Sequence, residues 1–526
     1  MRFLLLLACL ALGILALGWI LRLLRPLPPL ADRPASAALG NTADTSLGRL
    51  LAPLAAAHPG LSGILPLSDA HEAFAARMLL IRKAERSLDL QYYIWRADVS
   101  GRLLLEEVRK AADRGVRVRL LLDDNGTSGL DRELAFLHRH PHIEVRLFNP
   151  FTIRRPKLLG YAMDFFRLNR RMHNKSLTAD NQATIIGGRN IGDEYFGASQ
   201  ESLFVDLDVL AAGAVVPRLS ADFDRYWESE SAYPADRILR LAGEPVAIAP
   251  ASAEAQGRAQ AYEHMVRESL IARELAAREL ASGRSDFEWT AVQMVSDDPA
   301  KGLGKARDSD LLIGRLLPLL GNPEQRLALV SAYFVPTTSG TAQLTALARG
   351  GVEVSVLTNA LNATDVAVVH AGYAKHRRAL LEGGVRLYEL KGEGKASLKL
   401  TPSGSGSISR PVFRASGSSL HAKTFALDGA RIFVGSFNFD PRSASLNTEL
   451  GFLIDSPRLA GALQAMFDEE GGEAAYEVRL SADGRSLMWL DEADGKRSLL
   501  LKEPNSGPLQ RTILKLLALL PIDWLL

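Results

Sequence analysis

Six residues suited to acid–base and nucleophilic chemistry form two copies of one pattern. In each copy a lysine follows a histidine by two positions and an aspartate follows it by seven. The two sets are His173, Lys175 and Asp180, and His421, Lys423 and Asp428. One match to so short a pattern is weak evidence. Two intact matches, offset by 248 residues, indicate one site built from both copies.

These residue types suit the transfer of a phosphodiester group. A histidine and a lysine two positions apart on a strand point to the same side of it. Two lysines, with Asn190 and Asn438 each 17 residues after a motif histidine, can hold a phosphate. One imidazole can attack phosphorus and form a covalent phosphoenzyme. The other can protonate the leaving oxygen and then deprotonate the acceptor. Because two lysines neutralise the phosphate, the pattern predicts no metal and no cofactor.

Length and composition restrict the class of protein. A chain of 526 residues exceeds one ordinary core, so two or more domains are expected. The formal net charge of +2 lacks the basic excess of most nucleic-acid-binding proteins. The single cysteine, Cys9, excludes disulfides within the chain and cysteine metal sites, and no cysteine nucleophile lies in the rest of the chain.

The N-terminus carries an uncharged apolar stretch from Phe3 to Ile20, with arginines on both sides. This length is just sufficient to cross a bilayer. We expect a retained transmembrane anchor over residues 1–25, in preference to a cleaved signal peptide, and a linker over residues 26–62. Positive charge on both sides leaves the orientation open.

The segments that must position the motifs alternate between strands and helices, and their order occurs twice. The expected strands are residues 87–95, 116–124 and 143–150 in the first copy and 327–336, 351–359 and 385–390 in the second. Offsets of 236 to 240 residues between the copies indicate an internal duplication. We therefore predict two α/β/α lobes related by a pseudo-two-fold axis. Each should hold a mixed, mostly parallel sheet flanked by helices.

The duplication also sets the expected boundaries. The predicted parts are a first lobe at 63–250, a linking helix at 251–290, a second lobe at 291–475 and a C-terminal hairpin with an amphipathic tail at 476–526. For the last apolar helix we favour docking on the body over an interfacial membrane contact. For the basic, aromatic segment at 154–171, contact with anionic lipid and an ordinary solvated helix stay equally open.

The duplicated motif resembles the signature of the phospholipase D superfamily, and the resemblance covers roughly residues 65–480. The stretches "LQYYIW", "LLLDDN" and "RRMHNKSLTADNQATIIGGRNIGDEYF" are further similar to bacterial cardiolipin synthases, especially their C-type branch. The resemblance implies that His173 is the nucleophile and His421 the general acid and base. It also implies that Lys175 and Lys423 bind phosphate.

The resemblance assigns further roles outside the histidines and lysines. The motif aspartates Asp180 and Asp428 are expected to orient local structure. A downstream carboxylate is expected to orient the histidine of the opposite copy. Glu449 fits this role in the second copy, and either Asp206 or Asp208 fits it in the first.

The implied activity is that of a phosphatidyltransferase that makes cardiolipin in the bacterial inner membrane. Its expected substrate is phosphatidylglycerol, with phosphatidylethanolamine as a further candidate. A hydrolytic phospholipase D, releasing phosphatidic acid, is the main alternative, because no motif residue decides between water and a lipid alcohol. A nucleic-acid phosphodiesterase is disfavoured by the near-neutral charge, and a non-catalytic lipid-binding module by two intact motifs. The membrane side and oligomeric state stay open.

Overall fold

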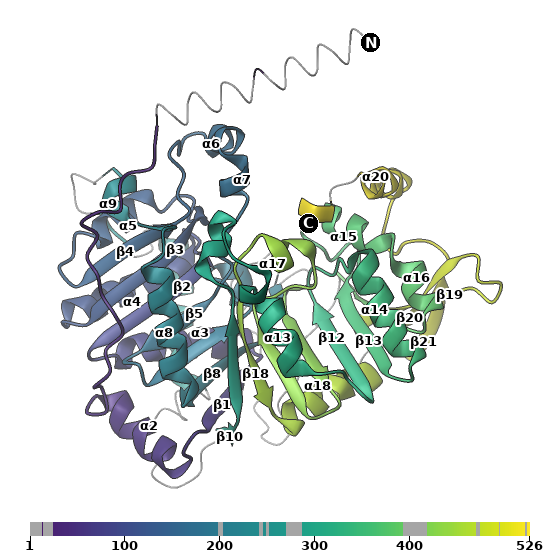
Figure 1. Cartoon of the computed structure of the whole chain (residues 1–526), viewed down its shortest axis with the longest axis horizontal. Helices are drawn as coiled ribbons and strands as arrows, with labels where there is room; N and C mark the ends of the chain where they lie inside the picture. The colour runs from purple at the N-terminus through teal and green to yellow at the C-terminus, as the bar shows by residue number, and fades with distance from the viewer. Residues whose placement is uncertain are drawn as a thin grey trace.

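The structure, a computed structural model, shows two lobes side by side (Figure 1). It describes Gly13 and residues 25–197, 203–240, 246–248, 252–269, 287–392, 418–469, 474–493, 495–520 and 523–525. The anchor expected at residues 1–25 lies almost wholly outside this set. Within the described residues, no helix has the length and apolarity needed to cross a bilayer.

The first lobe is built on a nine-stranded sheet with the order β10-β1-β8-β6-β5-β2-β3-β4-β9. The strands are β1 (Ser62–Leu67), β2 (Ser87–Ile94), β3 (Arg117–Gly126), β4 (Ile143–Phe148), β5 (Ser176–Ala179), β6 (Ala183–Gly187), β8 (Asp208–Gly213), β9 (Ala232–Pro234) and β10 (Glu288–Thr290). The helices are α2 (Ser46–Ala57), α3 (Ala70–Lys83), α4 (Val99–Asp113), α5 (Asp131–Leu137), α6 (Lys157–Met163), α7 (Phe165–Leu168), α8 (Val215–Trp227), α9 (Ala235–Ile238) and α10 (Ala253–Glu268), with the 3-10 turn η1 (Asp193–Tyr195).

The second lobe repeats this sheet as β11-β18-β17-β16-β12-β13-β14-β19-β20-β21. The strands are β11 (Val292–Ser296), β12 (Arg326–Ser331), β13 (Glu353–Asn359), β14 (Arg386–Leu390), β16 (Lys423–Leu427), β17 (Arg431–Gly435), β18 (Leu450–Asp455), β19 (Ala475–Leu480), β20 (Leu487–Ala493) and β21 (Lys496–Leu500). The helices and 3-10 turns are η2 (Pro299–Leu303), η3 (Asp308–Asp310), α13 (Leu312–Leu320), α14 (Thr337–Arg349), α15 (Ala367–Ala374), α16 (Arg377–Glu382), α17 (Pro441–Ser445), α18 (Pro457–Glu469), α20 (Pro508–Ala518) and η4 (Asp523–Leu525).

Helices cover both faces of the first sheet, and the alternation along β2 shows why. Leu88 and Leu90 point into the core formed with α3 and α4. Asp89, between them, faces the other way and pairs with Arg119 at 2.7 Å. The Arg119 guanidinium lies 4.8 Å from the ring of Phe223 on α8. Successive side chains of a strand alternate between faces, so one strand packs against the helices on both faces of the sheet.

The expectation of mostly parallel sheets is wrong. Among the described strands, only β2–β3 and β3–β4 are parallel in the first sheet, and only β12–β13 and β13–β14 in the second. Helical crossover connections produce these parallel pairs and no others in the described parts of the two sheets. Each motif strand instead turns back in a tight hairpin, which adds antiparallel strands. The β5–β6 turn has φ of 52° at Asp180 and 51° at Asn181, and positive φ at both central residues defines the type I′ hairpin turn.

Two segments differ from the expected division of the chain. The expected linker at 26–62 contains α2, which begins where the Thr45 hydroxyl accepts a hydrogen bond from the Gly48 amide. The expected linking helix at 251–290 contains α10, but its last residues form β10 at the edge of the first sheet. Residues 270–286 lie outside the described part.

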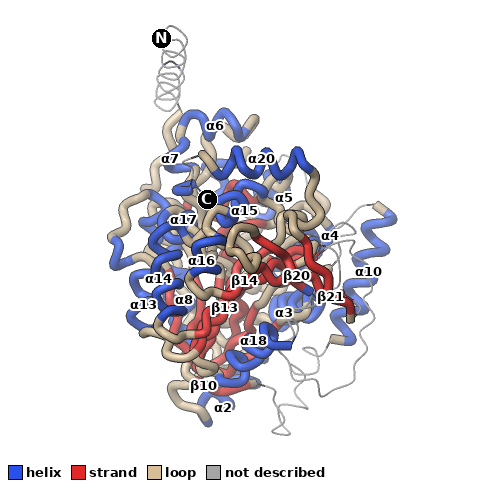
Figure 2. Tube along the Cα trace, turned by 90° about the vertical axis from the view of Figure 1, so that its right-hand side faces the viewer, coloured by secondary structure: helices blue, strands red, loops and turns tan. Residues whose placement is uncertain are grey.

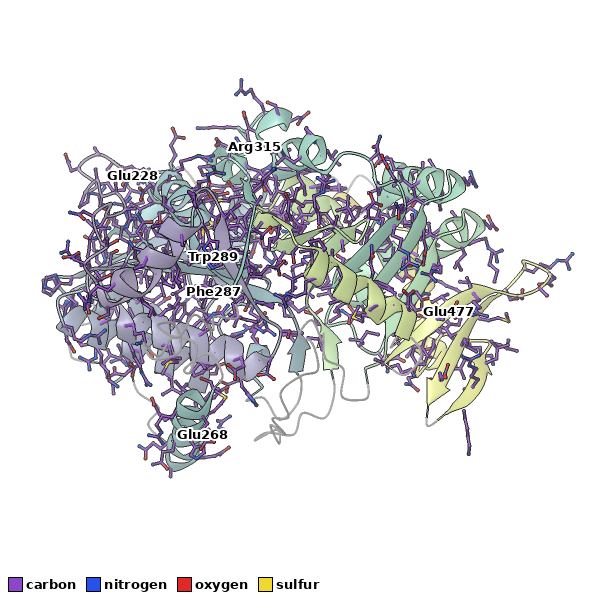
Figure 3. The ribbon with its side chains drawn as sticks, turned by 90° about the horizontal axis from the view of Figure 1, so that it is seen from below. Glu228, Glu268, Phe287, Trp289, Arg315 and Glu477 are labelled. Atoms are coloured by element: carbon purple, nitrogen blue, oxygen red, sulfur yellow. The ribbon has the colours of Figure 1, made fainter. Side chains whose placement is uncertain are left out.

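The two lobes meet through a shared apolar core, the isolated parallel bridge between Met172 and Thr448, and one pair of short strands. One core cluster draws residues from both lobes, among them Ile186 and Val209 from the first and Val434 and Phe452 from the second. The strand β7 (Leu203–Val205) pairs in parallel with β15 (Ser418–Leu420). Figure 3 labels Phe287, just before β10, and Trp289, within β10, where the chain leaves the first sheet for β11 of the second, and it shows Glu477 far out on the second lobe.

Candidate active site

His173 lies just before β5 and is held by residues of the other lobe. Its amide donates to the Thr448 carbonyl at 2.8 Å. Its Nδ1 lies 2.9 Å from Glu449 Oε2 and 3.1 Å from the Ser436 carbonyl oxygen. Two acceptors around Nδ1 place the proton on that nitrogen, so the lone pair of this tautomer is on Nε2.

His421 is held in the same way by the first lobe. It follows β15, and its amide donates to the Val205 carbonyl at 2.8 Å. Its Nδ1 lies 2.6 Å from Asp206 Oδ2. Each histidine therefore takes its orienting carboxylate from the opposite lobe, and neither lobe holds a complete site.

The structure distinguishes the two aspartates that the sequence left open. Asp206 contacts His421, whereas Asp208 pairs with Arg77 at 2.9 Å and with Arg189 at 3.3 Å. Gly188 permits the close approach of Asp206, because a Cβ at this glycine would lie 2.1 Å from Asp206 Oδ1.

The two motif lysines lie buried beside their histidines. Lys175 Nζ donates to the His173 carbonyl at 2.5 Å, and Lys423 Nζ donates to the His421 carbonyl. Burial lowers the pKa of Lys175 well below its usual range, and burial also lowers that of Lys423. The Lys423 charge also lowers the pKa of Lys175, although the nearby carboxyl of Glu449 opposes this with a larger effect. Such a pair is suited to binding an anion.

Burial and the lysines make both imidazoles weak bases in the free site. Burial and then the charges of Lys175 and Lys423 lower the pKa of His173 well below its usual value, with a further contribution from His421. Burial and Lys423 also lower the pKa of His421, although Asp206 opposes the change. His173 is therefore neutral at pH 7, as a nucleophile must be.

The two orienting carboxyls differ in acidity. Burial opposes ionisation of Asp206, but the charge and hydrogen bond of His421, helped by Lys423, lower its pKa to about 2. Burial raises the pKa of Glu449 to about 7, and Lys175 opposes this only in part. His421 thus faces a permanent carboxylate, whereas His173 faces a carboxyl that exchanges its proton near neutrality.

The motif aspartates accept hydrogen bonds from backbone amides and do not contact the histidines. Asp180 accepts hydrogen bonds from the amides of residues 85, 86 and 87. Asp428 accepts them from the amides of residues 324, 325 and 326. Each fixes the hairpin turn of its motif strand to the start of the neighbouring strand, β2 or β12. They position the site from a distance.

The two motif asparagines differ in their contacts. Asn190 accepts from the Ile94 amide at 3.1 Å and donates to the Tyr195 hydroxyl at 3.0 Å. The buried Oδ1 of Asn438 has no hydrogen-bond partner among the described residues. Asn438 therefore has polar capacity left for a ligand, whereas the side chain of Asn190 positions Tyr195.

Aromatic residues that sequence reasoning did not assign to the site surround both imidazoles. The Tyr93 ring meets His173 edge-on at 5.0 Å. Tyr195 and Phe204 lie 5.2 and 5.1 Å from His421. Tyr333 occupies the position of Tyr93 in the second copy and donates to Asp365 at 2.8 Å. The match of Tyr93 with Tyr333 between the copies was the available signal. Among the described residues no cluster of three or more metal-ligating side chains occurs.

Comparisons with known proteins place the chain in a family. A family model described as "Cardiolipin synthase, PLD-like domain" matches residues 78–227 and 316–470. Cardiolipin synthase C of Escherichia coli (strain K12) is 47% identical over 483 residues, which cover 91% of this chain and 99% of that protein. An uncharacterized protein of Helicobacter pylori (strain J99) is 32% identical over 480 residues, 88% of each chain. The crystal structure of phosphatidylserine synthase from Haemophilus influenzae Rd KW20 covers 91% of this chain with a TM-score of 0.52 and 15% identity, a likeness of fold.

Proposed function

We propose a reaction for this site from the premise that the chain belongs to the cardiolipin synthase, phospholipase D-like family. The chain is a phosphatidyltransferase of the cardiolipin synthase type. It moves a phosphatidyl group from one phospholipid to an alcohol of another. The observation that carries this conclusion is the pair of histidines, each oriented by a carboxylate of the opposite lobe.

In the first step, Nε2 of His173 attacks phosphorus and the bond from phosphorus to the leaving head-group oxygen breaks. Protonated His421 gives its Nε2 proton to that oxygen. Lys175 and Lys423 bind the non-bridging oxygens. The bound phosphodiester offsets their charge, which removes one cause of the lowered pKa of His421 and favours its protonated form.

In the second step, neutral His421 takes the proton of the acceptor hydroxyl. The acceptor oxygen attacks phosphorus, the bond between phosphorus and His173 breaks, and both histidines return to their starting states. An acceptor hydroxyl from phosphatidylglycerol gives cardiolipin. Water as the acceptor gives phosphatidic acid through the same steps.

The difference between the carboxyls supports this division of roles. An imidazolium is stabilised by the permanent charge of Asp206, so His421 is suited to carry the proton. Glu449 holds its proton more tightly, which keeps His173 neutral and oriented for attack.

The lipids and the location are part of the same proposal. Phosphatidylglycerol is the proposed substrate, with phosphatidylethanolamine as a further phosphatidyl donor. The uncharged apolar stretch Phe3–Ile20 supports an N-terminal anchor in the bacterial inner membrane.

Product analysis tests the proposal. Purified enzyme in mixed micelles receives labelled phosphatidylglycerol, with and without phosphatidylethanolamine. Cardiolipin is expected, and His173→Ala and His421→Ala are each expected to abolish it. Free phosphatidic acid without cardiolipin would contradict the transferase assignment in favour of hydrolysis, and an active His421→Ala enzyme would contradict the shared site.

A further inference from the structure

Large apolar side chains are exposed on the short helices α6 and α7 of the first lobe. Leu158 is 79% exposed and Phe166 is 76% exposed, and Leu159 and Phe165 beside them are also exposed. Arg155, just before α6, is exposed as well. Soluble monomers leave single apolar residues at the surface, but a contiguous group of this kind indicates a contact surface.

A second exposed apolar surface lies on α20, near the C-terminus. Leu509, Ile513 and Leu516 recur at intervals of four and three residues and therefore form one stripe along the helix, and exposed Leu520 follows just after its end. Leu509 is 72% and Leu516 is 60% exposed. The other side of the helix docks on α15 and buries Leu514. The expected docking of this helix is thus present, yet its apolar stripe faces outward.

Both surfaces lie on the same side of the molecule. Figures 1 and 2, which differ by a quarter turn, each show α6, α7 and α20 at the top. The first continuous part of the described chain, the purple end of the trace in Figure 1, begins beside α6 and α7. In the sequence it follows the apolar stretch Phe3–Ile20. Two exposed apolar surfaces and the start of the continuous described chain therefore lie on this one side.

Each surface also borders the active site. The Tyr161 ring of α6 meets the Phe151 ring edge-on at 5.1 Å, and the guanidinium of Arg171, two residues before His173, lies 5.6 Å from the same ring. Near the second surface, the carbonyl of Leu525 in η4 accepts a hydrogen bond of 3.0 Å from Arg442. Arg442 also donates to the carbonyl of Asn169 at 2.9 Å. Both surfaces therefore contact the segment that leads to His173.

We infer that α6–α7 and α20–η4 form one bilayer-contact surface that sets the active site against the lipid head groups. A bilayer fits better than a protein partner, because the proposed substrate keeps its acyl chains in the membrane while its phosphate reacts. Exposed Arg155 and Lys515 add positive charge for anionic head groups. The inference rests on the proposed function only in naming a phospholipid as the substrate.

Tryptophan quenching tests the contact in the full chain. Trp524 of η4 is 52% exposed. On vesicles of phosphatidylglycerol and brominated phosphatidylcholine, Trp524→Phe is expected to remove a quenched part of the emission. In that background, Phe166→Trp should restore a quenched signal, because α7 meets the same bilayer. The matched control is Leu317→Trp, since Leu317 is 57% exposed but lies on α13, on another side of the molecule (Figure 1).

The outcomes separate the surface from its alternatives. Quenching at Trp524 and at Phe166→Trp, with none at Leu317→Trp, supports one contact surface. Quenching at only one of the two sites, at neither, or equally at the control overturns it. A protein partner or a second copy on these helices predicts no quenching by brominated lipid.

Activity provides the second measurement. Ile513→Glu and Leu516→Glu are each expected to lower the rate on vesicles about tenfold. Neither should change the rate on short-chain, water-soluble phosphatidylglycerol. Equal losses on both forms of lipid would contradict a role in bilayer contact. A wild-type chain inactive on both forms would overturn the proposed function, while the quenching result would still decide the surface.

Discussion

Replacing Asp206 with asparagine tests how the carboxylate assists His421. Asparagine keeps an acceptor oxygen of similar size 2.6 Å from His421 Nδ1, but it removes the negative charge. The charge matters only while His421 is protonated, which is the state that gives the leaving oxygen its proton. The substitution should therefore lower kcat and leave KM nearly unchanged.

The size of the loss follows from the environment of the carboxylate. The pKa of Asp206 is about 2 against the ordinary 3.8, and at about 1.36 kcal/mol per pKa unit the site favours the charged form by about 2 kcal/mol. Breaking a buried charged pair costs about 3–5 kcal/mol. A loss of about 2–5 kcal/mol in the transition state lowers the rate about thirty- to several-thousandfold.

The assay measures cardiolipin formation across pH, with thermal unfolding as a check on folding. Because Asp206 raises the pKa of His421, its loss should move the alkaline limb of the kcat profile to lower pH. The result that would refute the role of this carboxylate is a folded Asp206→Asn enzyme whose kcat lies within threefold of wild type. In that result the alkaline limb of its kcat profile would also lie at the wild-type pH.

Three further predictions concern the groups around the histidines. Glu449 has a pKa of about 7 in the folded chain against the ordinary 4.5, so folding takes up a proton and the free energy of unfolding should fall as pH rises from about 4.5 to 7. Glu449→Gln should remove this slope in pH-dependent denaturant unfolding; an unchanged slope would contradict the raised pKa. Asp208→Asn should lower the melting temperature, because buried Arg77 and Arg189 lose their partner, without moving the alkaline limb of kcat; a limb that moves as in Asp206→Asn would contradict this. Asp180→Ala should destabilise the chain by about 3 kcal/mol in urea unfolding and Asp428→Ala by less, because only Asp180 is fully buried; equal losses would contradict this reasoning.

The sequence was sufficient to predict that one site is shared by both copies, but not the full set of residues in it. The constant offset of 248 residues links His173 to His421, and in the structure each contacts a carboxyl group of the opposite lobe. The choice between Asp206 and Asp208 could not follow from spacing. Asp206 lies 33 residues after His173, whereas Glu449 lies 28 residues after His421, because the connecting segments differ in length.

Tertiary structure determines which of those aspartates contacts His421, and it also determines the strand directions in each sheet. Asp208 is drawn to Arg77, which α3 supplies from more than a hundred residues away. The alternation of strands and helices correctly indicated the parallel centre of each sheet. It did not reveal the antiparallel strands around that centre. The local signal for them was the pair of positive-φ turn residues, Asp180-Asn181 and Asp428-Gly429.

The central claim is that His173 carries the phosphatidyl group and His421 carries the proton. An activated donor, a phosphatidyl ester of p-nitrophenol, tests it, because nitrophenolate leaves without being protonated. His421→Ala enzyme should release about one nitrophenolate per active site and then stop, with the phosphatidyl group on His173 by mass spectrometry. His173→Ala enzyme should give no burst. A burst from His173→Ala, with the adduct on His421, would contradict the account.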